Sequence, residues 1–268
     1  MREITSLDEL KEIELEIMKK VHKFCCTNNI TYYLAYGTLL GAIRHNGFIP
    51  WDDDLDIWMF RDDYERFLKE FPVYGKKEGL YIAYKNTKPR YLRNMFKVCD
   101  ERTRRSDLNF LCDDPYGVFI DVWPIDGVPD SKLTRFFYLK WIRALRGIFF
   151  YSISNPELKP EFKKSKWKKL AGLILRKIIN PISFLEYEEK LMTRYDPKKS
   201  KNVSCYGSDV LVIPPQKDFI NAVLHEYEDT KFYVPRGYDN ILRIRYGDYM
   251  ILPENKDERK HVADVYWL

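Results

Sequence analysis

Several features that would place a chain in a specialised class are missing from these 268 residues. The five cysteines are odd in number and form no C-x-x-C pair, which argues against a disulfide framework and a structural zinc site. The first residues lead into a charged amphipathic segment and not into an apolar signal core. The longest apolar run, 170–185, is interrupted by Arg176, Lys177 and Pro181. We therefore expect a cytoplasmic protein without a transmembrane helix.

Positive charge is distributed unevenly along the chain. The net charge is +5, and 45% of the residues are hydrophobic, enough for a sizeable core. Between Ser131 and Ile182, 13 Lys or Arg residues stand against two Glu residues. Within this basic segment, residues 133–152 mix aromatic and basic side chains, which suits peripheral contact with an anionic membrane. A solvated helix packed on its own domain has the same composition. No compact recognition motif is present, so we expect no nucleic acid partner.

The most informative feature is an acidic cluster, Trp51-Asp52-Asp53-Asp54-Leu55-Asp56-Ile57, with four carboxylates in five positions. Like charges this close repel, and folded proteins usually retain them where a divalent cation, Mg²⁺ or Mn²⁺, binds their oxygens. If residues 54–57 form a strand, Asp54 and Asp56 point to the same face, because side chains alternate along a strand. Two-metal phosphoryl or nucleotidyl transfer requires such a pair of carboxylates.

A second segment supplies a further carboxylate. Residues 116–124, Tyr-Gly-Val-Phe-Ile-Asp-Val-Trp-Pro, form a strongly strand-like run with Asp121 in its apolar middle. A lone Asp in a buried strand costs several kcal/mol unless it is paired or bound to a metal. Asp121 is therefore the candidate for a third metal ligand, whereas Asp126, after Pro124, is predicted to lie in a turn.

The remaining pattern predicts an α/β (α+β) chain. Ser6-Leu7-Asp8-Glu9 has the spacing of a capping box, so a helix is expected over 7–28. Further helices are expected at 37–43, 62–71 (ended by Pro72), 184–194 and 238–246. Strands are expected at 31–36, 80–84, 94–99 and 116–124, and a loop at 155–160. No linker is evident, so residues 1–268 are predicted to form one domain with a basic helical insertion at about 130–200.

Three segments together resemble the LicD family, relatives of fukutin. The first is Tyr36-Gly37-Thr38-Leu39-Leu40-Gly41-Ala42-Ile43-Arg44-His45-Asn46-Gly47-Phe48-Ile49-Pro50-Trp51-Asp52-Asp53-Asp54-Leu55-Asp56. The second is Phe119-Ile120-Asp121-Val122-Trp123-Pro124-Ile125-Asp126-Gly127, and the third combines 235–239 with 246–253. They bracket residues 7–261. Fifteen residues separate Thr38 from Asp54, more than in ordinary nucleotidyltransferases, but LicD-like chains share this spacing.

This resemblance implies a polymerase-β-like nucleotidyltransferase core with a mixed sheet, put to an altered use. Family members look like transferases that move a phospho-alcohol, typically phosphocholine, from a CDP-linked donor such as CDP-choline. The acceptor is a sugar hydroxyl of a cell-surface glycan, for example a lipid-linked precursor of teichoic acid or lipopolysaccharide. An enzyme of this kind would work in the cytoplasm, at the inner face of the cell membrane.

The charge of such a donor suggests roles for particular residues. Asp54 and Asp56 would hold the metal, and Asp121 would complete the site and accept the proton of the attacking hydroxyl. Gly37 and Thr38, at a helix N-terminus, would contact the donor phosphates. Three basic residues could add positive charge, or could be structural: Arg44, His45 and Lys97. If the alcohol is choline, four aromatic residues could face its ammonium: Tyr36, Trp51, Trp58 and Trp123.

Three other functions could account for parts of this sequence. An EF-hand fails, because its sixth position would be Ile57 where Gly is required and its twelfth would be Asp63 where Glu is expected. A true nucleotidyltransferase acting on a small molecule uses the same metal chemistry and stays open. A non-enzymatic scaffold that binds glycan precursors through the basic segment also stays open.

Overall fold

The computed structural model describes residues 1–87, 91–105, 116–153, 170, 174–175, 177–205, 211–252 and 265–268. The predicted loop at 155–160 lies outside these residues. The α-helices of the described part are α1 (Leu7–Thr27), α2 (Tyr36–His45), α3 (Arg61–Lys77), α4 (Lys132–Ile153), α7 (Pro181–Met192) and α8 (Tyr238–Tyr246). The strands are β1 (Arg2–Glu3), β2 (Tyr33–Leu34), β3 (Asp56–Phe60), β4 (Leu80–Ala83), β5 (Phe96–Asp100), β6 (Thr103–Arg105), β7 (Phe119–Gly127), β8 (Val203–Cys205), β9 (Ala222–Tyr227), β10 (Thr230–Pro235) and β11 (Val265–Trp267).

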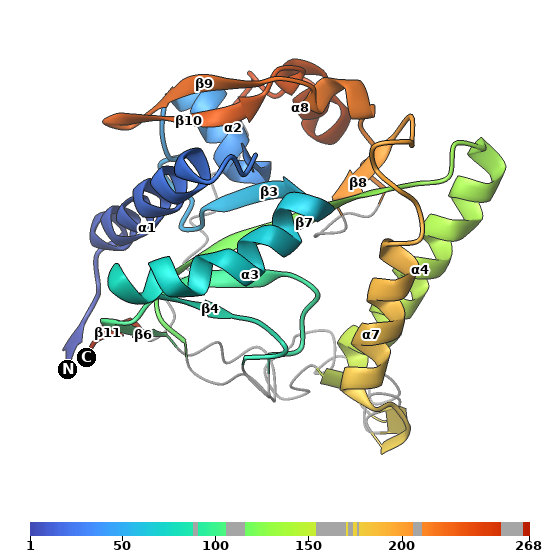
Figure 1. Ribbon diagram of the computed structural model, residues 1–268, viewed down its shortest axis with the longest axis horizontal. Coiled ribbons are helices and arrows are strands. Elements are labelled where there is room, and N and C mark those ends of the chain that lie inside the picture. The colour runs from blue at the N-terminus through green and yellow to red at the C-terminus, as the bar shows by residue number, and fades with distance from the viewer. Residues whose placement is uncertain are drawn as a thin grey trace.

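A mixed sheet forms the centre of the molecule (Figure 1). Its strand order is β2-β3-β7-β5-β4, with β8 paired to the far end of β7. β3 and β7 run parallel, and the other pairs are antiparallel. Helices α1 and α3 cover one face of the sheet (Figure 1). The predicted mixed α/β architecture is thus confirmed.

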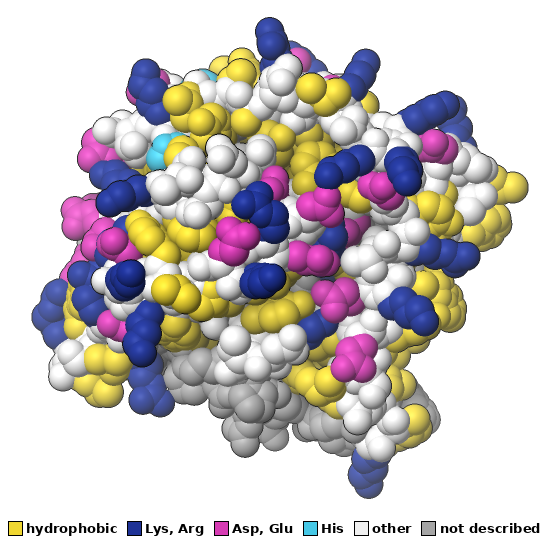
Figure 2. All heavy atoms as spheres, viewed as in Figure 1, with side chains coloured by type: hydrophobic (Ala, Val, Ile, Leu, Met, Phe, Trp, Pro, Cys, Tyr) yellow, Lys and Arg dark blue, Asp and Glu magenta, His cyan; other side chains and the backbone are white. Residues whose placement is uncertain are grey.

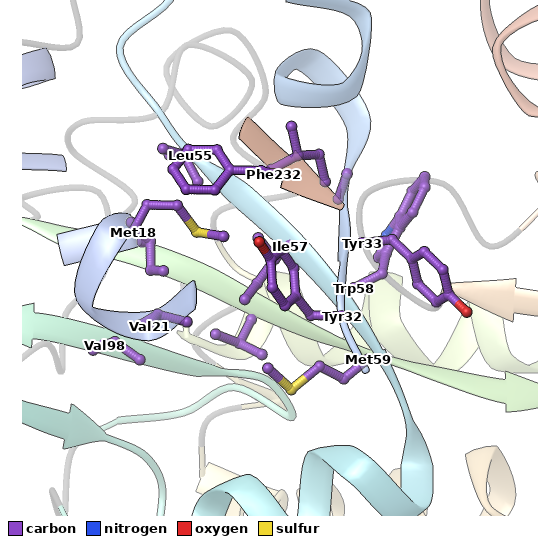
Figure 3. Packing of buried hydrophobic residues seen from close by; sticks show 14 of the residues in the cluster. Met18, Val21, Tyr32, Tyr33, Leu55, Ile57, Trp58, Met59, Val98 and Phe232 are labelled. Atoms are coloured by element: carbon purple, nitrogen blue, oxygen red, sulfur yellow. The ribbon is translucent and has the colours of Figure 1, made fainter. Parts of the chain in front are cut away.

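Helix α1 begins where the capping box predicted. The Ser6 side chain accepts a hydrogen bond from the backbone N–H of Glu9, and Asn28 follows the last turn. One stripe of α1 is buried, including Met18 and Val21. Figure 3 shows these two side chains directed at Ile57 of β3, whereas Trp58 points to the opposite side of the strand. Alternation along β3 therefore divides the sheet into an apolar face against α1 and a second face that carries the polar residues.

Two helices differ from the prediction. Helix α3 does not end at Pro72 but continues to Lys77 with Pro72 inside it. Phe71 and Gly75 are buried on its inner side, and this packing outweighs the hydrogen bond that proline cannot donate. Helix α2 begins at Tyr36, which has a positive φ of 44°. The strand predicted over 31–36 is consequently reduced to Tyr33–Leu34.

The remaining elements surround this core. The tip of β7 leads into α4, which packs against α7 to one side of the sheet (Figure 1). Strands β9 and β10 form a hairpin above α2, and β11 lies between β1 and β6, so the two chain ends are neighbours. No helix in the described ranges is both long and apolar enough to span a membrane. The basic insertion as a separate unit stays a prediction.

A buried ion pair fixes α3 to the sheet. Arg61 Nε and Nη2 donate to the two carboxylate oxygens of Asp126 at 2.8 and 2.5 Å, and the two side chains are 9% and 1% exposed. Asp126 therefore belongs to β7, and its predicted place in a turn is wrong. Its partner lies 65 residues away in sequence, which local pattern could not reveal.

We expect Arg61→Met to lower the free energy of unfolding by about 3–5 kcal/mol, because it leaves a buried carboxylate unpaired. The double variant Arg61→Met/Asp126→Leu should recover most of this loss. The exposed Lys198–Asp62 pair, with a 2.6 Å contact, is the matched control, and Lys198→Met should change stability little. Urea denaturation measures all three, and a double variant as unstable as Arg61→Met would contradict the role of the pair.

Candidate active site

Strand register places two of the predicted catalytic residues, Asp56 and Asp121, beside each other, with Lys97 beside Asp121. In the parallel pair β3–β7, Asp56 lies opposite Asp121, and in the antiparallel pair β5–β7, Lys97 lies opposite Asp121. The three side chains therefore form one row across three strands, on the face opposite α1. Asp56 is 7% exposed and Lys97 is 5% exposed. This row joins Asp56 and Asp121, which were expected in one metal site, with Lys97, which was expected to add positive charge near the phosphates.

Neighbouring groups hold the row in place. Lys97 Nζ donates to Asp121 Oδ1 at 2.5 Å, and Trp123 Nε1 donates to Asp56 Oδ1 at 2.8 Å. The backbone N–H of Asp56 donates to Thr38 Oγ1 at 2.8 Å, which ties the start of β3 to α2. Each carboxylate thus has one oxygen fixed by a donor.

Asp54 completes the acidic group from outside the strand. Strand β3 begins at Asp56, so residues 54–57 do not form one strand, and the alternation expected to put Asp54 and Asp56 on the same face does not apply. The Asp54 side chain is exposed to solvent, although the surrounding protein displaces part of its hydration. Desolvation, with repulsion from Asp52 and Asp121, raises the pKa of Asp54 to about 7. Burial, then the charges of Asp54 and Asp121, also raises the pKa of Asp56 well above its usual value.

The chemistry of this site fits a divalent cation. Asp54 and Asp56 offer oxygen ligands, and their raised pKa values show that Lys97 alone does not neutralise the group. Within the described ranges, however, no three acidic, His or Cys side chains are already gathered around one point. Asp121 instead turns one oxygen toward Lys97. The three-ligand metal site stays a prediction.

Gly37 and Thr38 contact residues of the acidic cluster 51–57. A Cβ atom on Gly37 would lie 2.6 Å from Asp52 Oδ2, so a larger residue here would require this carboxylate to shift. Asp52 thereby lies at the N-terminal end of α2, where the helix dipole favours a negative charge. The Thr38 hydroxyl already accepts from Asp56. These contacts give both residues a structural role, and their contact with donor phosphates stays a prediction.

Arg44 and His45 lie in the last turn of α2. Arg44 Nη1 donates to the carbonyl of Tyr249 at 2.9 Å, which ties α2 to the segment after α8. The ring of His45 packs edge-on against Trp51, with centroids 6.2 Å apart. Structural contacts therefore account for both residues, and a role in phosphate binding stays a prediction.

The four predicted aromatic residues separate into a group of three and a single residue. Tyr36 packs edge-on against Trp58 and Trp123, with centroids 4.9 and 5.9 Å away. Trp51 instead packs on His45. The guanidinium of Arg245, from α8, stands 4.5 Å from the centre of the Tyr36 ring. Arg245 thus takes the place on Tyr36 that a choline ammonium was predicted to occupy.

Sequence reasoning missed one further acidic residue, Glu14. It is 0% exposed on the inner side of α1, and neither carboxylate oxygen has a hydrogen-bond partner among the described residues. Burial, followed by the charge of Asp54, raises the pKa of Glu14 well above its usual value. The signal was available: Glu14 follows Leu10 by four residues and precedes Ile17 by three, on the apolar stripe.

Comparisons with known proteins identify the family of this chain. Residues 29–130 match the family described as LicD/FKTN/FKRP, nucleotidyltransferase domain. Over 272 aligned positions the chain is 30% identical to the lipopolysaccharide cholinephosphotransferase LicD of Haemophilus influenzae, with all of both chains covered. The chain belongs to the LicD family. Two matches to uncharacterized proteins are shorter. A Rickettsia typhi protein is 37% identical over 97 residues, 36% of this chain and 28% of its own length. A Rickettsia prowazekii protein is 36% identical over 104 residues, 38% of this chain and 39% of its own length.

The segment that matches the family model includes some residues of the site and leaves out others. The matched range 29–130 contains the acidic cluster, the row of Asp56, Asp121 and Lys97, and the aromatic group of Tyr36, Trp58 and Trp123. Arg245 and Glu14 lie outside it. The family comparison thus covers the centre of the site, while α1 and α8 add residues from elsewhere in the chain.

We expect Glu14→Met to raise the free energy of unfolding by about 1–3 kcal/mol near neutral pH, because it removes a buried, unpartnered carboxyl group. The raised pKa means that folded Glu14 keeps its proton after the unfolded chain has lost it. Wild-type stability therefore falls as pH rises above the unfolded value, and the gain from Met grows between pH 5 and pH 8. Thermal melts at both pH values measure this. A gain that is larger at pH 5 would contradict the assignment.

Proposed function

We propose that this protein is a metal-dependent phosphotransferase that moves a phospho-alcohol from a CDP-linked donor to a sugar hydroxyl of a cell-surface glycan precursor. Phosphocholine is the best-supported group, because the full-length relative in Haemophilus influenzae is a lipopolysaccharide cholinephosphotransferase. The observation that carries the proposal is the row of Asp56, Asp121 and Lys97 in strand register, with Asp54 beside it.

Asp54 and Asp56 are the residues that would hold Mg²⁺ or Mn²⁺. The cation would neutralise the diphosphate of the donor and favour in-line attack. Trp123 and Thr38 fix the position of Asp56 through hydrogen bonds to its side chain and backbone. The orientation of the carboxylate is thus set before any substrate binds.

Asp121 is suited to take the proton of the acceptor. Its Oδ1 accepts from Lys97 and its side chain is 15% exposed, and Oδ2 is the oxygen that would receive the proton of a sugar hydroxyl. As the hydroxyl oxygen bonds to the phosphorus, its proton passes to Asp121 Oδ2 and the P–O bond to cytidine monophosphate breaks. The Lys97 ammonium keeps the charge balanced beside this step.

Trp123 is the aromatic residue best placed for a choline headgroup. It is half-buried, whereas Tyr36 and Trp58 are buried, and the face of Tyr36 is taken by Arg245. A quaternary ammonium against an indole contributes roughly 0.5–2 kcal/mol. Because the same indole holds Asp56, headgroup recognition and carboxylate position would depend on one side chain.

A true nucleotidyltransferase would use the same carboxylates, so the product decides between the two reactions. Incubation with a panel of CDP-alcohols, a sugar acceptor and Mg²⁺ should release cytidine monophosphate and give an acceptor that carries the phospho-alcohol. An acceptor that gained a nucleotide would overturn the proposed reaction. A scaffold would release nothing.

We predict that Asp56→Asn lowers turnover by at least about 100-fold, since it removes a charged ligand at the reacting phosphate. Trp123→Phe should lower it by about tenfold, because the ring remains while the hydrogen bond to Asp56 is lost. Cytidine monophosphate release measures both, and circular dichroism checks that the variants are folded. Trp267→Phe, far along the chain in β11, is the matched control and should keep full turnover.

Removal of divalent cations provides a separate prediction. Dialysis against EDTA should abolish release of cytidine monophosphate, and Mg²⁺ or Mn²⁺ should restore it. Calorimetric titration of the wild type with Mn²⁺ should show binding that Asp56→Asn weakens by about tenfold or more. Full turnover in EDTA would exclude the metal-dependent reaction.

A further inference from the structure

Helix α4 carries two apolar faces. One is buried against α7 and the end of β7, and its residues are Leu139, Ile142, Phe149 and Ile153. At about 100° per residue, the opposite side of the helix holds a second stripe of large apolar residues. This second stripe is exposed: Leu133 is 69%, Phe137 63%, Trp141 53% and Ile148 41% accessible to solvent.

These exposed residues form one row. They recur at intervals of four, four and seven residues, which keeps them on the same side of an α-helix. Phe136 lies beside the row and is 50% exposed. A large contiguous apolar surface on a helix is a recognised mark of an interaction site.

The basic residues of α4, like its apolar residues, fall into an inner group with partners and an outer group that faces solvent. The helix contains no Asp or Glu. Arg146 forms an ion pair with Glu188 on the inner side, and Arg135 donates to the carbonyl of Pro129. Lys132, Lys140 and Arg143 are exposed, and no ion pair within the described residues involves them. Lys140 Nζ lies 4.4 Å from the centre of the Phe136 ring, at the edge of the row.

Figure 2 shows how apolar and charged side chains are distributed on this side of the surface. Hydrophobic and basic side chains alternate along the right-hand edge of the molecule, where Figure 1 places α4, and acidic side chains lie closer to the middle of that view. The outward face of α4, defined by Leu133, Phe137, Trp141 and Ile148 with Lys140 and Arg143, is therefore apolar and positively charged.

We propose that the outward face of α4 docks on the surface of an anionic phospholipid membrane. Aromatic and aliphatic side chains enter the boundary between headgroups and acyl chains, while the flanking Lys and Arg side chains reach the lipid phosphates. Charge argues against a second copy of the chain as the occupant, because a symmetric contact would bring the two sets of cations together. The purpose of this docking rests on the proposed function. It would bring the active site to a lipid-linked acceptor, which would lie at such a surface.

Vesicle sedimentation tests the docking without donor or acceptor. The protein should sediment at low salt with vesicles of phosphatidylcholine and phosphatidylglycerol, and much less with phosphatidylcholine alone. Phe137→Ser/Trp141→Ser should weaken binding by about tenfold or more, and Lys140→Glu/Arg143→Glu by a similar factor. The matched controls are on α3: Val73→Ser, at a residue 70% exposed, and Lys76→Glu/Lys77→Glu, which make the same kinds of change and should leave binding intact.

Fluorescence tests the orientation of the helix. The emission of Trp141 should shift to shorter wavelength when anionic vesicles are added, because the indole leaves water. Trp141→Phe should remove this shift while keeping most of the binding, since phenylalanine is also apolar. A shift of equal size in Trp141→Phe would place the contact elsewhere and overturn the proposal.

The remaining outcomes are equally decisive. Absence of vesicle binding at low salt, or equal loss in the α3 controls, overturns the lipid assignment. If the protein does not bind vesicles but forms a dimer, and Phe137→Ser/Trp141→Ser dissociates that dimer, the face binds a second copy of the chain and the proposal is overturned. Transfer to a water-soluble sugar acceptor should be unchanged in the α4 variants. Vesicle binding by a protein that transfers nothing would leave docking in place and reject the proposed function alone.

Discussion

The parallel register of β3 and β7 is the constraint from which the site follows. It sets Asp56 directly beside Asp121, two carboxylates that repel each other in a poorly solvated place. The contacts around them make this arrangement tolerable. Trp123 holds one oxygen of Asp56, Lys97 holds one oxygen of Asp121, and Thr38 binds the backbone where β3 begins. Each of these groups comes from a different element, so the geometry of the site depends on the packing of the whole sheet.

The opposite face of the sheet supplies the rigidity that such a site needs. Met18 and Val21 of α1 pack on Ile57 (Figure 3), and Arg61 of α3 is joined to Asp126 at the far end of β7. Both helices thereby act on the strands that carry the carboxylates. Helix α7 contacts this support, because its Glu189 lies 3.6 Å from Arg61. Helix α4 follows the tip of β7, and its outward face lies on the far side from the sheet (Figure 1). The surface chemistry of that face can therefore differ without a change in the site.

Local features were predictable from the sequence, and long-range ones were not. The capping box at Ser6, the acidic cluster and the lone Asp121 can each be recognised from a few consecutive residues. The Lys97–Asp121 contact depends on the register of β5 with β7, and the contact of Arg245 with Tyr36 joins distant parts of the chain. Helix α3 passes through Pro72 because burial of Phe71 and Gly75 outweighs local preference. Asp126 was misplaced for a related reason, since only its partner on α3 explains a buried carboxylate at that position.

The buried ammonium of Lys97 gives the chain an internal counter-ion. It is almost enclosed and lies 3.3 Å from the centre of the Phe119 ring as well as beside Asp121. One of the negative charges of the site is therefore balanced by the polypeptide itself. The folded chain thus carries part of the charge compensation that the acidic site needs before any ion binds.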